Sequence, residues 1–375
     1  MSTEEEYERA RALILEYGWN ATAYQILNPG IARWFSAARD GVVGFVRHRR
    51  TLVVAGAPVC DIARLAAIAA EFVADAHSRG YKVCYFGAGN RLESAYVNDP
   101  RWSRVLLGAQ PVWDPHGWSA AVAKRASLRG QFNRARNKGV RVSEWNAERT
   151  ENDLALRRCL SEWLAARHLP PLHFLVEPET LSHRRDRRVF VAERGERAVV
   201  AFTVLSPVAA RNGWLVEQIV RGLNAPNGTA ELLLDSAMRA IAESGSTYAT
   251  LGLSPLSQRA QLQPPHQALW LRLLLKWVRL HGARFYNFGG LDAYKAKFNP
   301  RSWEPIYAIA EGAKFSPTAL YAIAGAFSGG APIRLIIRAL LRAALEELTS
   351  LSGRLRSRMR KNPEAPHKRR ERRLS

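Results

Sequence analysis

Cysteine is scarce in this sequence. Only Cys60, Cys84 and Cys159 occur among 375 residues, and no two of them form a CxxC pair. We therefore expect neither a disulfide framework nor a thiolate zinc site. The nine histidines are scattered, and the GxSxG, HExxH, P-loop and GxGxxG patterns are absent. The sequence thus gives no motif for a hydrolase, a zinc protease or a nucleotide-binding enzyme, and we expect neither metal nor redox chemistry.

A long uncharged apolar run is also missing. The longest lies near residues 317–333, is rich in glycine, and is shorter than the roughly 20 residues that span a bilayer. Residues 1–18 are acidic and then helical in pattern, which differs from the basic and then apolar start of a signal peptide. We therefore expect a cytoplasmic protein without a transmembrane helix.

Acidic residues are too few to balance the basic ones. The chain has 55 Lys and Arg against 33 Asp and Glu, a formal net charge of +22, and this field attracts phosphate-bearing partners such as nucleic acid or anionic lipid. A hydrophobic content of 47% still supports a packed core. The length favours two domains, and we predict boundaries at residues 1–150, 151–312 and a tail at 313–375.

The first half combines strands with helices. Residues 41–46 and 51–56 read as a hairpin, a helix opens at Asp61 and stops at Gly80, and a buried strand starts at Lys82. Residues 124–139 carry six basic residues and no acid beside an apolar helical stripe. This segment is either a solvated surface helix or a phosphate-binding one, and the missing acids favour the latter. The candidate phosphate-binding residues of this segment are Arg125, Arg129, Arg134, Arg136 and Lys138.

The second half has an informative order of elements. After a helix near residues 154–166 and two strands joined at Gly195, a third strand ends at Arg221, and a loop then leads into a helix and a further strand. GNAT-type acyltransferases build their donor site from this order, with loop amides and a helix N-terminus around a phosphate. Asn227, Gly228 and Thr229 occupy that position and are candidate substrate-binding residues, although an ordinary Asn-Gly turn gives the same pattern.

Several blocks resemble the catalytic region of lysylphosphatidylglycerol synthases. They are VEQIVRGLNAPNGTAELL from Val216, LGLSPL from Leu251, HGARFYNFGGLDAYKAKFNPRSWEPIY from His281 and, more loosely, SLRGQFNRARNKG from Ser127. The blocks follow the family's order at fitting intervals and imply a resemblance over roughly residues 17–310. The resemblance implies an α/β fold of tandem GNAT-like domains with mixed sheets flanked by helices. It also implies a lipid acceptor site near the second domain and a tRNA-binding surface, for which the candidate residues are Arg125, Arg129, Arg134, Arg136 and Lys138.

The resemblance also suggests catalytic residues. Arg221 matches the family's Arg before the APNG loop, and Lys295 matches the Lys of the YKxKF block. Gln218 stands where the family commonly has Asp, so Glu217 is the candidate that takes this role. In a regular strand Glu217 and Arg221 share a face, but a bulge reverses this. Alternatively, Glu217 only neutralises Arg221.

The chemistry requires little else, because an aminoacyl ester is already activated. We expect aminoacyl-tRNA as co-substrate and no cofactor. The site should contain an acid, a cation and oxyanion donors that position the reactants. Lys297 shares a face with Lys295 if that segment is extended. The further candidate substrate-binding residues, besides Gln218 and Lys297, are Tyr286, Asn287 and Tyr294.

The end of the chain is strongly basic. Residues 333–348 predict a basic amphipathic helix, followed by a disordered basic tail that binds either an anionic membrane or tRNA. The leading hypothesis is transfer of an amino acid from aminoacyl-tRNA to a phospholipid such as phosphatidylglycerol, at the inner face of the cytoplasmic membrane. Two alternatives stay open: an N-acyltransferase that uses acyl-CoA or a peptide acceptor, and a noncatalytic nucleic-acid or membrane adaptor.

Overall fold

The computed structural model describes residues 3–151, 153–166, 173–177, 181, 185–196, 198–260, 270–271, 273–275 and 288–329. All of these residues belong to one compact unit that spans Met1–Pro332. The predicted amphipathic helix and tail at 333–375 lie outside the described residues, as do Tyr286 and Asn287. No helix within the described ranges combines the length and apolar character that crossing a membrane requires.

Within the described residues, thirteen strands form one mixed sheet in the order β1-β2-β3-β5-β13-β6-β11-β10-β9-β8-β7, with β4 paired to β2 and β12 to β6. The strands are β1 (Ala32–Phe35), β2 (Gly41–His48), β3 (Thr51–Ala55), β4 (Val59–Cys60), β5 (Lys82–Ala88), β6 (Trp102–Trp113), β7 (Val140–Trp145), β8 (Arg188–Arg194), β9 (Ala198–Val208), β10 (Gly213–Arg221), β11 (Tyr248–Thr250), β12 (Ser254–Pro255) and β13 (Ser302–Glu311).

Helices cover both faces of this sheet. They are α1 (Thr3–Tyr17), η1 (Tyr24–Leu27), η2 (Ile62–Arg64), α2 (Leu65–Ser78), α3 (Asn90–Tyr96), η3 (Pro115–Gly117), α4 (Trp118–Ala123), α5 (Ala126–Asn137), α6 (Ala147–Glu151), α7 (Leu154–Ala165), η4 (Phe174–Val176), η5 (Ala209–Arg211), α8 (Thr229–Glu243), α10 (Phe288–Ala296) and α11 (Pro317–Phe327). The predicted α/β fold, a mixed sheet flanked by helices, is confirmed.

The local predictions for the first half are confirmed. β2 and β3 form the expected hairpin, and the Asp61 carboxylate accepts a hydrogen bond from the Ala63 amide at the turn that leads into α2. In α5 the apolar residues Leu128, Phe132 and Ala135 are buried, while the basic residues lie outside.

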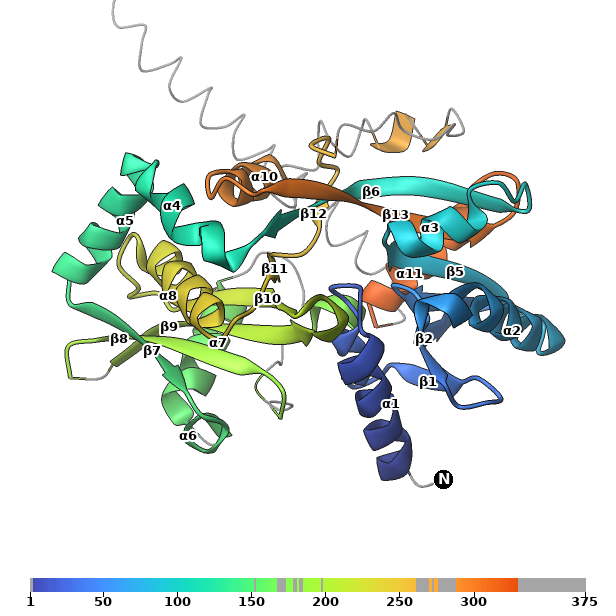
Figure 1. Ribbon diagram of the computed structural model, residues 1–375, viewed down its shortest axis with the longest axis horizontal. Coiled ribbons are helices and arrows are strands. Elements are labelled where there is room, and N and C mark those ends of the chain that lie inside the picture. The colour runs from blue at the N-terminus through green and yellow to red at the C-terminus, as the bar shows by residue number, and fades with distance from the viewer. Residues whose placement is uncertain are drawn as a thin grey trace, which may run out of the picture. The chain divides into compact units, whose positions relative to one another are not determined.

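The sheet runs continuously through both halves of the chain. β13 comes late in the sequence but lies between β5 and β6 in the sheet. Figure 1 shows β13 running alongside β6. β7 precedes residue 150 but pairs with β8. Distinct apolar clusters nevertheless pack α2 against β5 in the first half and α8 against β8–β10 in the second. The boundaries at residues 150 and 312 stay predictions.

Candidate functional site

The strand β10 carries a bulge in the segment where the sequence predicts chemistry. β10 pairs antiparallel with β9, and the register shifts between Val216 and Gln218, which makes Glu217 the extra residue. Val216 and Ile219 pack in the apolar cluster with α8, whereas Val220 packs in the cluster with α7. Arg221, two residues after Ile219, therefore lies on the α8 side of the strand.

Glu217 is turned toward a buried arginine. Its Oε1 accepts a hydrogen bond from Arg187 Nε at 2.7 Å, and the two side chains are only 8% and 1% exposed. Arg187 also donates to Asn28 Oδ1 at 3.1 Å. The bulge thus places Glu217 in a buried ion pair next to η1, and its catalytic role stays a prediction.

The loop after β10 makes a tight approach to α5. Gly228 has a φ of +93°, and a Cβ at this position would lie 2.1 Å from the backbone oxygen of Gln131. Thr229 is the first residue of α8, and its hydroxyl donates to the Pro226 carbonyl at 2.7 Å, while Asn227 is exposed. The N-cap residue of α8 is Gly228, which has no side chain to cap the first turn, and the Thr229 amide donates to the Pro226 carbonyl at 3.2 Å. Uncapped amides at a helix N-terminus favour an anion, so the predicted loop is suited to a phosphate.

Lys295 is buried next to the segment that joins β11 to β12. Its Nζ donates to the carbonyls of Gly252 and Leu253, both at 2.9 Å. Burial lowers the pKa of Lys295 from 10.5 to about 7, and the nearby Asp292 carboxylate opposes this shift. Lys295 therefore braces the segment between β11 and β12.

The extended conformation considered for the YKxKF block is wrong. Residues Phe288–Ala296 form α10, and Lys297 follows in a turn. Lys295 and Lys297 consequently contact different partners, because Lys297 Nζ donates to Glu231 Oε1 at 2.5 Å. Lys295 lies in the last turn of α10 and Lys297 lies beyond its end, so the alternation of a strand does not set their directions.

Four side chains gather at the start of α8, and we call Arg221, Glu231, Tyr294 and Lys297 the α8 charge cluster. Lys297 Nζ lies 4.0 Å from the centre of the Tyr294 ring. Burial raises the pKa of Tyr294, with Glu231 raising it further and Arg221 lowering it. The Tyr294 hydroxyl is buried and has no hydrogen-bond partner within the described part of the chain. A buried hydroxyl without a partner is uncommon in folded proteins, which makes Tyr294 a candidate for a polar role.

The candidate tRNA-binding residues of α5 are exposed, and α5 packs against α8. Arg125 donates to Asn299 Oδ1 at 3.4 Å, and Arg136 lies 3.7 Å from the buried Asp235. The remaining candidates are Arg129, Arg134 and Lys138. The structure thus places this basic helix against the loop that carries Gly228. RNA binding there stays a prediction.

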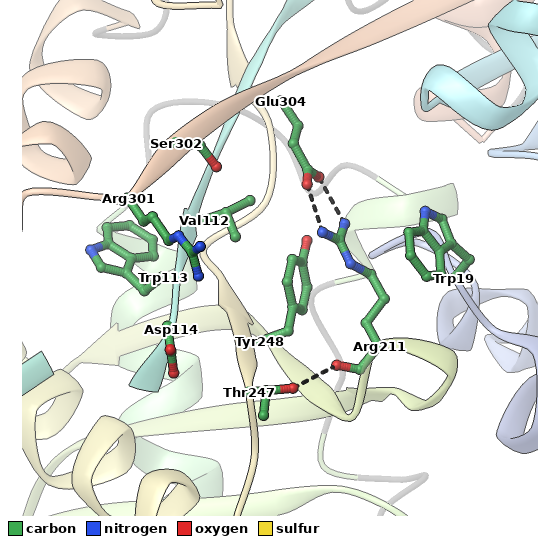
Figure 2. Close-up of a pocket in the computed structure, with 10 residues that line it drawn as sticks. All are labelled: Trp19, Val112, Trp113, Asp114, Arg211, Thr247, Tyr248, Arg301, Ser302 and Glu304. Atoms are coloured by element: carbon green, nitrogen blue, oxygen red, sulfur yellow. Dashed lines mark hydrogen bonds and ion pairs between the residues drawn. The ribbon is translucent and has the colours of Figure 1, made fainter. Parts of the chain in front are cut away.

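Sequence reasoning missed a cavity of about 430 Å³. Figure 2 shows the Arg211 guanidinium facing the Glu304 carboxylate, which it binds at 2.6 and 2.8 Å, with Tyr248 close by. The same guanidinium lies 3.7 Å from the centre of the Tyr248 ring and 4.7 Å from that of Trp19. The lining comes from separate segments of the chain, so no local motif signals this cavity.

Taken together, the structure brings Arg221, Tyr294, Lys297 and the Gly228 loop to the start of α8. It adds Glu231, which the sequence interpretation omitted because an acid in the first turn of a helix is commonplace. Glu217 and Lys295 make other contacts. The arrangement can hold a phosphate at uncapped amides and donate a hydroxyl hydrogen bond to an acyl oxygen.

Comparisons with known proteins agree with this architecture. The crystal structure of the C-terminal domain of a proposed lysylphosphatidylglycerol synthetase from Agrobacterium fabrum superposes with a TM-score of 0.73 at 24% identity, covering 88% of this chain and 99% of that one. For L-PGS from Bacillus licheniformis the TM-score is 0.69 at 20% identity, with coverage of 90% and 96%. At these identities the likeness establishes the fold: this is an α/β chain with lysylphosphatidylglycerol synthase architecture.

The sequence comparison identifies the family. The model described as "Phosphatidylglycerol lysyltransferase, C-terminal" matches residues 11–310, and the chain belongs to this family. The phosphatidylglycerol lysyltransferase of Bacillus subtilis is 23% identical over 302 residues, and that of Staphylococcus aureus is 25% identical over 311 residues. Each alignment covers 80% of this chain but only 34% and 35% of the relative, so the chain spans about a third of their length.

Proposed function

We propose that this chain is an aminoacyltransferase that moves an amino acid from aminoacyl-tRNA to a membrane phospholipid such as phosphatidylglycerol. The observation that carries the proposal is the α8 charge cluster beside an uncapped helix N-terminus, in a chain of the phosphatidylglycerol lysyltransferase family. The formal net charge of +22 supports both an RNA donor and an anionic lipid acceptor. The proposed place of action is the inner face of the cytoplasmic membrane.

The donor would bind through its phosphates. The amides at the start of α8 and the exposed Arg221 guanidinium offer charge-assisted hydrogen bonds to a phosphate near the tRNA 3′ end. The basic face of α5, packed against the same loop, would follow the RNA backbone. The absence of acids from residues 124–139 favours this contact of α5 with RNA.

The transfer is an acyl substitution that requires no cofactor. The acceptor hydroxyl oxygen attacks the ester carbonyl and loses its proton, the new ester forms, the old ester bond breaks, and the tRNA ribose oxygen leaves with a proton as a free hydroxyl. The Tyr294 hydroxyl, which is neutral and whose pKa burial raises further, would donate a hydrogen bond to the carbonyl oxygen as negative charge develops. Lys295 would hold the segment at Gly252 and Leu253 in place.

One observation favours a noncatalytic adaptor as the second candidate. Glu217, the candidate for the family's acid, is paired with Arg187, and Gln218 cannot replace a carboxylate. A chain that keeps the fold and the basic surface would then bind tRNA and lipid without transfer.

A labelled-transfer experiment separates the two candidates. The purified chain is incubated with tRNA that carries radiolabelled amino acids and with anionic vesicles, and the lipid is extracted and counted. Our proposal predicts label in the lipid that ribonuclease treatment abolishes. Neutral vesicles serve as the control for lipid charge. Confirmed tRNA binding without any label in lipid would reject transfer to phospholipid and favour the adaptor.

A further inference from the structure

The tip of the β2–β3 hairpin is strongly basic. Arg49 and Arg50 form the turn between the two strands, Arg47 lies near the end of β2, and Lys82 begins β5 beside β3. All four side chains belong to exposed residues, and the Lys82 amide donates to the Arg50 carbonyl at 2.9 Å. We call Arg47, Arg49, Arg50 and Lys82 the hairpin basic cluster.

Turn chemistry does not explain the arginines at this tip. Arg49 has a φ of +51°, in the left-handed region that glycine and asparagine adopt most readily. Two-residue turns between strands usually carry one of those residues at such a position. An arginine held in an unfavourable backbone conformation suggests that its charge has a use.

The acids closest to this cluster are engaged with other groups. Asp75 pairs with Arg79 at the end of α2. Glu311 Oε1 accepts from the Val83 amide at 2.8 Å, and its Oε2 lies 2.8 Å from His77 Nε2. Within the described ranges, none of the four basic side chains forms an ion pair with a carboxylate. The hairpin basic cluster therefore keeps its positive charge.

The basic side chains surround the end of the sheet on both of its faces. Arg47 Nη1 donates to the Tyr81 hydroxyl at 3.1 Å, and Tyr81 packs in the apolar cluster with α2. The Arg49 guanidinium lies 4.7 Å from the centre of the Tyr321 ring in α11, which packs in a different cluster. Successive residues of β3 contact one cluster and then the other, so α2 and α11 cover opposite faces. A flat surface across the end of the sheet would meet all of these cations.

An anionic bilayer is a flat surface of the required charge. Basic residues are attracted to anionic phospholipid headgroups, and tyrosine rings favour the interface between membrane and water. Tyr81 and Tyr321, which hold the two arginines, are half-buried. The candidate RNA contacts, Arg221 and the basic face of α5, belong to the second half of the chain. Charge and shape thus favour a lipid surface for the hairpin basic cluster.

We propose that the hairpin basic cluster is a docking surface for an anionic phospholipid bilayer. Docking goes beyond the proposed function, because it requires no aminoacyl donor. It rests on the proposed function only for its purpose, which is to hold the chain at the membrane that contains the acceptor.

The test measures co-sedimentation of the full chain with phosphatidylcholine vesicles that contain or lack phosphatidylglycerol, without tRNA. The test variant combines Arg49→Gly with Arg50→Ser, which removes two charges and gives a Gly-Ser turn that two-residue hairpins favour. We therefore expect it to fold, and thermal denaturation checks this. The matched control combines Arg141→Ser with Arg157→Ser, which removes two exposed arginines from the second half.

The native chain should bind the vesicles that contain phosphatidylglycerol. The test variant should bind them at least about tenfold more weakly, as expected for two basic residues at an anionic surface. The control should bind as the native chain does, because charges away from the docked surface are screened. Undiminished binding of the test variant, or an equal loss in the control, overturns the inference. Loss of affinity for tRNA but not for vesicles would assign the cluster to RNA and overturn it as well.

A fluorescent probe tests whether the hairpin itself contacts the bilayer. Cys60, Cys84 and Cys159 are buried, so an environment-sensitive probe attaches selectively at Arg50→Cys or, as the control, at Arg141→Cys. Anionic vesicles should shift the emission to shorter wavelength only for the probe at Arg50→Cys. Equal shifts at both positions, or none at the hairpin, would contradict docking through this surface.

Docking and transfer can fail independently. Vesicle binding that depends on the cluster can stand in a chain that transfers no amino acid to lipid. If transfer occurs, the test variant should raise KM for phosphatidylglycerol in vesicles and leave transfer to a short-chain, monomeric phosphatidylglycerol unchanged. An equal loss with both acceptors would place the cluster in the acceptor site and overturn its assignment as a docking surface.

Discussion

The two halves of the chain contain the same unit of strand, helix and parallel strand, but the ends of the strands differ. In the first half β3 and β5 stay paired up to Ala55 and Phe86, and the Gly56 amide still donates to the Phe86 carbonyl. In the second half β10 and β11 pair only as far as Leu215 and Thr250, and the bulge at Glu217 follows.

The residues at these strand ends differ as well. A Cβ on Gly56 would meet Thr22 Oγ1 at 2.6 Å and Asn20 Nδ2 at 3.0 Å, so the chain's own side chains fill the first end. The end of β10 instead carries Arg221, which belongs to the α8 charge cluster. The comparison teaches that one supersecondary unit supports packing in one half and a candidate site in the other, because the site depends on side chains and not on the fold.

The largest effect on stability should come from Glu217, because it forms the buried ion pair with Arg187. Glu217→Ala leaves Arg187 buried without its carboxylate, and we expect the free energy of unfolding to fall by about 3 to 5 kcal/mol. Urea denaturation measures this, with Glu243→Ala as an exposed control. If Glu217→Ala keeps the stability of the native chain but loses transfer, Glu217 takes part in the chemistry.

Lys295 should make the stability depend on pH. The pKa of Lys295 is lowered from 10.5 to about 7 by burial, so between these values the unfolded chain holds a proton that the folded chain lacks. Stability therefore rises with pH across this window. Relative to Lys295→Met, the native chain should gain about 2.5 kcal/mol between roughly pH 6 and pH 9.

Lys314→Met is the control for this prediction, because Lys314 is exposed. The difference in the free energy of unfolding between Lys314→Met and the native chain should not change with pH. If the difference for Lys295→Met is also independent of pH, Lys295 is charged in its buried position.

The two halves should also differ in their tolerance of alanine at glycine. Gly228 and Gly80 both have positive φ, but a Cβ meets the Gln131 backbone at Gly228 and nothing within 4 Å at Gly80. Gly80→Ala should cost about 1 kcal/mol for its left-handed backbone. Gly228→Ala should cost about 2 kcal/mol more and should impair transfer. Equal costs in thermal denaturation would contradict the close approach of α5.

The smallest predicted effect compares two arginines at the strand ends. Arg221→Met should lower kcat/KM for transfer about tenfold, equivalent to about 1.4 kcal/mol, because a phosphate contact is lost. Arg91, which stacks on Trp19 in the first half, should change it less than about twofold when replaced by Met. If Arg91→Met lowers kcat/KM more than Arg221→Met does, the donor binds in the first half of the chain and not in the second.

The sequence predicts the local elements of this site well. The order of β10, loop, α8 and β11 follows from turn residues and apolar periodicity near Gly228, and the basic face of α5 follows from helical spacing. The family blocks also indicate Arg221, Tyr294 and Lys297, which the structure places together. These features depend on neighbouring residues, so a single sequence carries them.

Features that depend on distant partners were not predictable. The bulge at Glu217 depends on the register with β9, and its ion pair depends on Arg187, 30 residues away. The YKxKF block has no strong local signal for a helix, and α10 forms there nonetheless. β13 pairs with β5 and β6, which precede it by about 200 residues in the sequence, and such pairings lie outside local pattern reasoning.

The central claim is that the aminoacyl end of the donor binds at the end of β10, in the second half of the chain, and not at the end of β3 in the first half. The most direct measurement is photo-crosslinking of the chain to aminoacyl-tRNA with 8-azidoadenosine at its 3′ end, followed by mapping of the labelled peptides. Our account predicts label in peptides that contain Arg221 to Glu231 or Tyr294 to Lys297. Label confined to peptides around Trp19, Gly56 and Arg91 would contradict it.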